Sequence, residues 1–400
     1  MRPVEIKKDI FWVGAVDYDR RDFHGYSLSP EGTTYNAYLI KDKKNVLLDT
    51  VSASFADAML CRLAGALPPE KVDYIVCHHL ELDHAGALAE LVERCKPEKI
   101  FCSQLGAKSM QGHFACQDWP VQAVKHGESL SIGSRTLRFF ETRMLHWPDS
   151  MVSYLPEDKL LFSNDAFGQN ISSTARYADE VGEEYLRAAI EEYYYNIVLP
   201  FSPQVLDALK ALGGLEIDMI APDHGLIHRG KQSVGFILDA YARLAEQKPL
   251  GRALVVYDSM WHATEKMAYA VADGLEEAGV PSRLMSLKHN HHSRVMTELA
   301  RCGAVLAGSP THNNGILPDM AGMLTYMKGL RPKNRIGGAF GSYGWSGEGP
   351  KIVHEWLESM GMEMPVPFVK TQWTPGRESL GRCHELGKAV GRVLLAKCGG

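Results

Sequence analysis

The stretch from residue 77 to residue 84 constrains this chain most strongly, because it places potential metal ligands directly behind an apolar run. Residues 74–76 are typical of a β-strand, and the letters CHHLELDH follow them. Four of these side chains can donate lone pairs to a metal ion: His79, Glu81, Asp83 and His84. Side chains at alternate positions converge where a strand passes into a loop. The segment therefore predicts one half of a two-metal site, with His84 facing the second ion.

Further candidate ligands lie downstream, each at the end of a strand-like segment: His146, Asp165 and His224. His146 comes shortly after the apolar segment 136–140. Asp165 follows a predicted hairpin formed by residues 151–155 and 159–162, and His224 follows the segment 217–221. Together with the first segment, these residues suffice for two metal ions that share one carboxylate.

The spacing His-x-Glu-x-Asp-His resembles the metal-binding signature of the metallo-β-lactamase superfamily, with Glu81 in place of the second histidine of the usual zinc version. A carboxylate adds negative charge and a hard oxygen donor, which favours iron or manganese over zinc. Within the superfamily, this version resembles the flavodiiron proteins. The resemblance implies one iron on His79, Glu81 and His146, a second iron on Asp83, His84 and His224, and Asp165 as the bridge. In such sites the residue at the position of His84 is sometimes off the metal, so its role stays open.

The alternative interpretation is that these are ordinary polar residues at loop ends, which would be the better expectation for any one of them alone. Their number across roughly 150 residues, each behind an apolar strand, argues against coincidence. The remaining histidines without such a context are expected at the surface or outside the ligand set: His113, His126, His228, His354 and His384. His24 is intermediate, because the resemblance implies a place beside the substrate while an ordinary loop histidine remains an equal alternative.

The second half of the chain has a different pattern. Residues 253–257 are an apolar, strand-like run, the loop 258–264 follows, and a helical segment extends from residue 265 to about residue 278. Ser259 and Thr264 can donate to phosphate oxygens, and the first amides of the helix would point at the same anion. The loop lacks the glycine pattern of dinucleotide folds, so one phosphate, and hence FMN, fits better than NAD or FAD.

Two later loops support a flavin site, because they follow the strand-like segments 304–308 and 335–340. Ligands of parallel sheets bind at such carboxyl ends, glycines allow close approach, and Trp345 offers an aromatic face. The three loops resemble those of flavodoxin, although Trp261 and His262 replace the usual Thr-Gly pair. The expected FMN-binding residues are Ser259, Met260, Trp261, His262, Thr264, Ser309, Pro310, Thr311, Asn313, Gly341, Ser342, Tyr343, Gly344 and Trp345. An α/β domain with empty glycine-rich loops is the alternative.

Length and composition suit two folded domains. The chain has 400 residues, of which 45% are hydrophobic and 23% charged. Residues 1–249 mix hairpins and helices, as in the αββα sandwich of the metallo-β-lactamase fold. Residues 250–400 alternate strand and helix, as in the doubly wound parallel sheet of the flavodoxin-like fold. The Pro and Gly of residues 247–251 indicate the linker.

Net charge and cysteine content limit the kinds of partner and the cellular compartment to be expected. A net charge of -5 gives no reason to expect nucleic acid or an anionic membrane, and the chain has neither a membrane-length apolar run nor a signal-peptide core. The eight cysteines form no C-x-x-C pair, so we expect reduced thiols in the cytoplasm. Without another redox motif, electrons must reach the flavin from a separate protein.

The resemblance covers essentially the whole chain. It implies an enzyme that takes electrons from rubredoxin through FMN to the diiron site and reduces dioxygen to water. Nitric oxide reduction to nitrous oxide is the alternative main activity. A zinc-dependent hydrolase with a flavodoxin domain is a less favoured alternative, and Glu81 argues against it. A non-catalytic gas or redox sensor would need a further module. The resemblance also implies a head-to-tail homodimer.

Two side chains are expected to act in catalysis as hydrogen-bond donors, His24 and Tyr194. Tyr194 represents the run 193–195, of which one tyrosine is expected to face the metals. A donor favours a negatively charged, partly reduced oxygen species over neutral nitric oxide, which favours oxygen as the substrate. The alternative is that the tyrosines only pack a helix.

Overall fold

The computed structural model describes residues 1–399 and divides into two compact units. The first contains Met1–Phe23, Ser29–Tyr194 and Phe201–Ala245. The second begins its long segment at Glu246 and also includes two short segments from earlier in the chain, His24–Leu28 and Tyr195–Pro200. The long segments therefore meet a few residues before the boundary predicted at 249/250.

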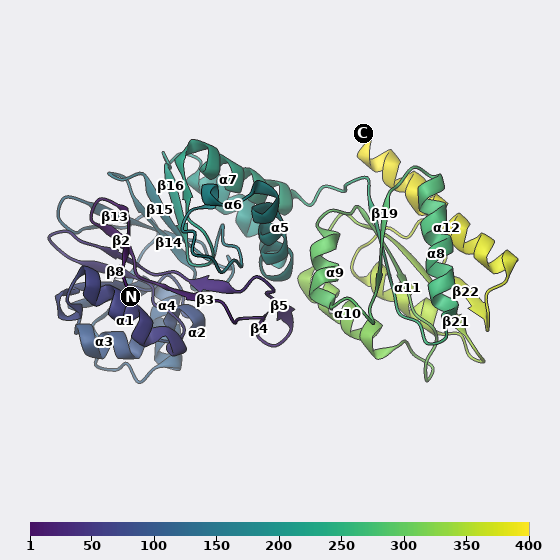
Figure 1. Ribbon diagram of the computed structural model, residues 1–400, viewed down its shortest axis with the longest axis horizontal. Coiled ribbons are helices and arrows are strands. Elements are labelled where there is room, and N and C mark those ends of the chain that lie inside the picture. Colours follow the sequence, from purple (N-terminus) through teal and green to yellow (C-terminus); the bar gives the residue numbers. More distant parts are fainter. Residues whose placement is uncertain (400) are drawn as a thin grey trace. The chain divides into compact units, whose positions relative to one another are not determined.

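Two sheets form the centre of the first unit (Figure 1). The larger has the order β1-β2-β7-β8-β9-β10-β11, with bounds Val4–Lys7, Ile10–Trp12, Tyr38–Ile40, Val46–Leu48, Tyr74–Val76, Lys99–Ser103 and Val121–Val124. The other has the order β12-β13-β14-β15-β16-β17, with bounds Ser129–Ser131, Thr136–Glu141, Met151–Leu155, Leu160–Asn164, Met219–Pro222 and His228–Arg229. Both sheets mix parallel and antiparallel pairs. Short pairs, Ala15–Asp17 with Thr33–Tyr35 (β3, β6) and Asp22–Phe23 with Ser27–Leu28 (β4, β5), lie outside them.

Successive side chains of a strand point to opposite faces of its sheet, so one face packs on the other sheet and the other face packs on helices. In β8, Val46 and Leu48 face a core shared with Phe162 of the second sheet, while Leu47 faces the helical side. This is the period of two expected for a strand buried on both faces. The helices on the side of Leu47 include α1 (Ala56–Ala66) and α3 (Leu88–Cys95), and α2 (Leu82–Ala85) and α4 (Gln104–His113) follow β9 and β10. Figure 1 shows α5 (Glu183–Tyr193), α6 (Ser202–Leu212) and α7 (Gly230–Glu246) beside the second sheet.

The second unit is built on a parallel sheet of order β19-β18-β20-β21-β22. The strands are Ser282–Ser286, Ala253–Tyr257, Ala304–Gly308, Ile336–Tyr343 and Val369–Gln372. The helices are α8 (Ala263–Glu277), α9 (His292–Leu299), α10 (Pro318–Leu330), α11 (Gly349–Ser359) and α12 (Arg377–Cys398). In chain order the strands lie 2-1-3-4-5, the flavodoxin-like arrangement, whose ligand site lies at the carboxyl ends beside the first strand. The αββα sandwich and the doubly wound sheet are both as predicted.

Two local expectations were wrong. Asp83 does not alternate with His79 and Glu81 in a loop but lies with His84 on the short helix α2, so the ligand run changes from loop to helix after Glu81. Thr264 is not a loop residue either, because α8 begins at Ala263. Among residues 1–399, none of the helices combines the length and apolar character needed to cross a bilayer.

Candidate metal centre and flavin site

Strand ends of both sheets position the predicted metal ligands. His79 and Glu81 lie in the loop after β9, and α2 then carries the next two ligands. His146 lies between β13 and β14, Asp165 directly follows β15, and His224 follows β16. The structure brings the whole predicted set together: His79, Glu81, Asp83, His84, His146, Asp165 and His224.

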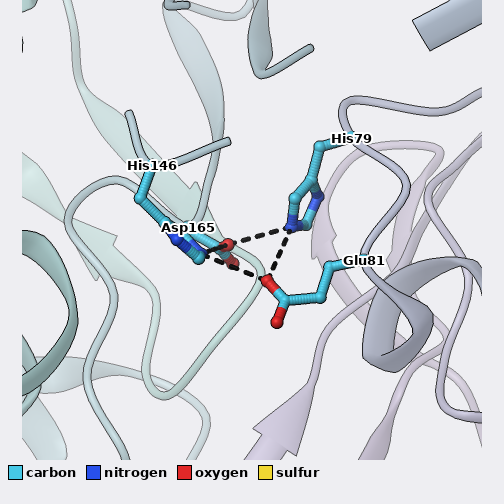
Figure 2. Close-up of side chains that lie close together, drawn as sticks. All are labelled: His79, Glu81, His146 and Asp165. Atoms are coloured by element: carbon cyan, nitrogen blue, oxygen red, sulfur yellow. Dashed lines mark hydrogen bonds and ion pairs between the residues drawn. The ribbon is translucent and has the colours of Figure 1, made fainter. Parts of the chain in front are cut away.

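One half of the cluster gathers around Oδ2 of Asp165 (Figure 2). The Nε2 atoms of His79 and His146 lie 3.0 and 2.8 Å from that oxygen. Glu81 closes the group, with its Oε2 3.3 Å from His146 Nε2 and 3.7 Å from His79 Nε2. Two imidazole nitrogens and two carboxylates therefore face a common point.

The other half gathers around Oδ1 of the same carboxylate. His84 Nε2 lies 3.1 Å and His224 Nε2 3.6 Å from Asp165 Oδ1. Asp83 Oδ2 lies 3.4 Å from His84 Nε2 and 3.2 Å from His224 Nε2. Each oxygen of Asp165 thus serves one half, which is the arrangement of a bridging carboxylate. His84 lies within the cluster.

The donor set fits two metal ions. His84 Nε2 and His224 Nε2 are 2.9 Å apart, so one of the two must lack a proton. Buried polar atoms with no hydrogen-bond partner in the described chain include His79 Nε2, Asp83 Oδ1 and Asp165 Oδ1. Buried polar atoms are normally satisfied, and these three belong to clustered residues that could hold a metal ion. Mixed imidazole and carboxylate ligands suit iron, and the three carboxylates supply negative charge against two cations.

Charge pairing dominates the electrostatics of this cluster. Burial raises the pKa of the Asp165 carboxyl, but attraction to His79 and His84 outweighs it and holds that pKa well below its usual value. Burial lowers the pKa of His146, but hydrogen bonding to Asp165 and Glu81 raises it to about 9. The pKa of His224 is raised by a similar balance, in which Asp83 outweighs burial. Metal ions would therefore displace ring protons on binding.

Tyr193, rather than Tyr194, faces the cluster. Its ring centroid lies 5.8 Å from that of His224, and Asp165 is among the charges that raise its pKa after burial. The hydroxyl of Tyr194 instead lies 3.0 Å from Ser202 Oγ, and its ring packs on Tyr241. Of the run 193–195, Tyr193 is therefore the tyrosine whose ring the structure shows against a clustered histidine.

His24 lies on the tip of the β4–β5 hairpin, in the segment counted with the second unit. Its side chain is exposed and its ring stacks on Tyr26 at 5.8 Å. Phe23, next to it, is the residue of this hairpin that packs edge-on against His224, at 5.6 Å.

Sequence reasoning missed several residues around the metal ligands. His224 Nδ1 lies 2.7 Å from the carbonyl oxygen of Thr34, and His79 Nδ1 lies 2.9 Å from Asn164 Nδ2. The indole of Trp147 stands edge-on to His79 at 6.0 Å. His228 is fully buried beside Ser233 rather than at the surface, consistent with a place outside the ligand set. The sequence marks Asn164 and Trp147 only as neighbours of Asp165 and His146, and it gives no sign of the contacts that they make.

The predicted flavin loops line a cavity of about 410 Å³ at the carboxyl ends of the parallel sheet. Nine of the expected residues line it: Met260, Trp261, Pro310, Thr311, Asn313, Ser342, Tyr343, Gly344 and Trp345. Trp261 and Trp345 are 88% and 84% exposed, so their indoles can cover a planar ring. The sequence missed Trp373, which follows β22, lines the same cavity and lies 6.3 Å from Trp345.

The other expected flavin residues do not line the cavity themselves, and His262 is exposed. Thr264 Oγ1 lies 3.0 Å from Ser342 Oγ, and His262 Nδ1 lies 2.6 Å from Glu265. Ser309 accepts a hydrogen bond from the amide of Leu317. Gly341 permits a close approach, because a Cβ there would lie 1.9 Å from Ser309 O. Among residues 1–399, Ser259 Oγ is buried without a hydrogen-bond partner, which suits a hydroxyl that donates to a phosphate.

Comparison with known proteins addresses the identity of both units. A model of the ODP family beta lactamase matches residues 33–225, and a flavodoxin model matches residues 255–386. A rubredoxin-oxygen oxidoreductase of Megalodesulfovibrio gigas is 52% identical over 99% of both chains. A nitric oxide reductase of Moorella thermoacetica is 44% identical over 97% of this chain and 98% of its own.

Solved structures similar to this chain belong to the same kind of protein as its sequence relatives. The rubredoxin oxygen:oxidoreductase from Desulfovibrio gigas superposes with a TM-score of 0.99 at 51% identity, covering 100% of each chain. The flavodiiron protein of Giardia intestinalis superposes with a TM-score of 0.95 at 33% identity, covering 100% of this chain and 98% of its own. This chain belongs to the flavodiiron protein family.

Family membership confirms the resemblance seen in the sequence, because both halves of this flavodiiron protein match over nearly their whole length. It also confirms the oxidoreductase class over a zinc hydrolase with a flavodoxin domain.

Proposed function

We propose that this flavodiiron protein takes electrons from rubredoxin through FMN to a pair of irons and reduces dioxygen to water. The observation that carries the proposal is the two-sided cluster around Asp165, in which each carboxylate oxygen meets two histidines. One iron would be held by His79, Glu81 and His146, the other by Asp83, His84 and His224, and Asp165 would bridge them.

The bound groups supply redox chemistry, since a flavin accepts electrons singly and stores two while two irons can deliver electrons to one diatomic gas. The protein holds the metal ligands and the flavin cavity in place. Asp165 fixes the two halves at a common carboxylate, and Glu81, Asp83 and His146 form the partly exposed side from which a small gas can enter. In the second unit, Trp345 and Trp373 flank the cavity for the flavin ring.

Electrons come from outside the chain. All eight cysteines are free, and six of them are buried, so the described chain offers no cysteine-based relay of its own. Rubredoxin is the proposed donor, supported by the name of the relative that is 52% identical. We place this reaction in the cytoplasm, where such thiols stay reduced.

Selectivity between oxygen and nitric oxide would rest on hydrogen-bond donors near the metals, because both gases are small and neutral. Tyr193 is the proposed donor, since its ring lies against His224. A charged oxygen species gains more from such a donor than neutral nitric oxide does. His24 remains a proposed second donor. Nitric oxide reduction is the second candidate activity, favoured by the relative that is 44% identical.

Steady-state turnover of each gas with reduced rubredoxin tests the proposal. We expect the parent to reduce oxygen faster than nitric oxide. Tyr193→Phe should lower the oxygen rate about 10-fold or more, as loss of one donor to developing charge does. Tyr194→Phe is the matched control and should keep the parental rate. Faster turnover of nitric oxide in the parent would assign that gas as the main substrate, and an unchanged oxygen rate in His24→Ala would remove His24 from the site.

The flavin cavity and the metal cluster belong to different units of the chain, and we propose that they work together across a head-to-tail homodimer. The flavin of one chain would then serve the irons of its partner. Sedimentation at assay concentration should show a dimer. A fully active monomer would exclude the arrangement.

A further inference from the structure

One buried carboxylate joins the two segments that carry the ligands of one half of the cluster. Asp149 is 1% exposed, and its Oδ2 accepts a hydrogen bond from the amide of Leu80 at 3.0 Å. Leu80 stands between His79 and Glu81, and Asp149 lies three residues after His146. A single side chain therefore connects the segment that holds two of these ligands with the segment that holds the third.

The backbone of Asp149 is anchored independently of its side chain. Its carbonyl oxygen accepts a hydrogen bond from Ser103 Oγ at 2.8 Å, and Ser103 ends β10 and caps α4 by accepting from the amide of Gly106. The strand β14 begins at Met151, whose amide donates to the carbonyl oxygen of His78 at 3.0 Å. These bonds do not involve the carboxylate, so they survive a change of that side chain.

The bond from Leu80 matters because this residue is fully buried, with its side chain in the core on the helical side of the larger sheet. A buried amide that loses its acceptor costs free energy, so the peptide would have to turn toward another partner or toward water. The residues on either side are His79 and Glu81. A turn of this peptide would therefore move two donor atoms of the same metal site.

The second oxygen of the carboxylate has no comparable partner. Asp149 Oδ1 is buried without a hydrogen bond to any of the residues that the structure describes. A buried carboxylate with an unsatisfied oxygen costs stability, and proteins keep such features mainly at functional sites. Asparagine has the same shape and keeps one oxygen, so it separates the hydrogen bond from the charge.

We propose that Asp149 is a positioning residue for one metal of the pair and acts through the amide of Leu80. Its carboxylate fixes the peptide that carries the neighbouring ligands and thereby sets the two ligand segments against each other. The ligands of the other metal on α2 are held separately, because the carbonyl oxygen of His84 accepts from the amide of Thr50 at 3.0 Å. This inference rests on the proposed diiron site.

The test measures how fast a chelator removes iron from the iron-loaded holoprotein, together with the Mössbauer signal of each iron. Asp149→Ala removes the acceptor and should release one iron per chain about 10-fold faster or more, the usual effect of losing a contact behind a metal ligand. The signal of that iron should change, while the signal of the other iron and the FMN content should stay parental. Asp149→Leu also lacks an acceptor but leaves less empty space, so it gives the same test if the alanine variant fails to fold.

Two further variants separate the hydrogen bond from other effects. Asp149→Asn keeps an oxygen for the amide of Leu80 and should release iron at close to the parental rate. Ser103→Ala removes a hydrogen bond to the backbone of Asp149 and leaves the carboxylate in place. It is the matched control, and both iron signals should stay parental.

Parental release in Asp149→Ala and Asp149→Leu, or equal acceleration of both irons, would overturn the proposal. Release from Asp149→Asn as fast as from the alanine variant would also overturn it, because the charge and not the hydrogen bond would then hold the metal. A parent that held two zinc ions would defeat the proposed function alone, since the chelator would then report the effect of Asp149 on zinc release.

Discussion

Asp165 offers one carboxylate oxygen to each half of the cluster, with His146 at 2.8 Å from Oδ2 and His84 at 3.1 Å from Oδ1. Replacement by alanine removes a donor from both proposed irons at once and leaves two cations to face each other with less screening. We predict that Asp165→Ala loses at least one iron per chain while FMN remains bound, as measured by metal and flavin quantitation.

The control for this variant is Glu191→Gln, which removes another buried carboxylate. Glu191 Oε1 pairs with Arg243 Nη2, 2.9 Å away, and not with a predicted metal ligand. It should keep the parental iron content. Full metal content and activity in Asp165→Ala would show that the bridge is assigned to the wrong residue.

Residues with a strict spacing behind apolar strands could be predicted, and residues that depend on long-range packing could not. His79 and Asp165 belong to the first kind. Asp149 and Asn164 belong to the second, because nothing in their local sequence says that one accepts from the amide of Leu80 and the other faces His79. The choice among three tyrosines failed because α5 passes into a π-helix at Tyr194–Val198, where the period of 3.6 no longer gives side-chain directions.

Among the helices, the close packing of α8 against α12 depends on a glycine. A Cβ at Gly274 of α8 would lie 1.9 Å from the carbonyl oxygen of His384 on α12. Because that neighbour is backbone, one helix must shift to accept a methyl group. We predict that Gly274→Ala destabilises the second unit by about 1–3 kcal/mol, the usual cost of overpacking, as measured by thermal unfolding followed through FMN release.

Gly381 on α12 is the matched position, because nothing lies within 4 Å of a Cβ there. Gly381→Ala should leave the melting temperature unchanged or raise it slightly, since alanine favours helix by up to about 1 kcal/mol. Equal melting temperatures for the two variants would mean that the helices can separate without cost.

The buried strands were predictable because continuous apolar runs mark them, and β9, β18 and β20 match the predicted bounds. The edge strand β22, Val369–Gln372, was missed because polar side chains alternate along its exposed side. Trp373, which follows it, was missed for the same reason. The helix α2 is only four residues long, too short to show a helical period.

At the scale of the whole molecule, the fold class followed from the order of the patterns, a mixed region and then regular strand–helix units. The assignment of residues 24–28 and 195–200 to the second unit could not be predicted, because it depends on contacts far apart in sequence. One is the bond from Arg335 Nη2 to the hydroxyl of Tyr195, at 2.7 Å. Another is the hydrogen bond between Asn196 and Thr297, at 3.0 Å.

The proposed reaction requires that one chain carries two irons on the Asp165 cluster and one FMN in the cavity beside Trp345. Metal and flavin quantitation of protein made with iron available, together with rubredoxin-driven turnover of the same sample, tests it most directly. We expect two irons and one FMN per chain, and turnover that falls with iron content. Two zinc ions per chain with no iron-dependent turnover would contradict it.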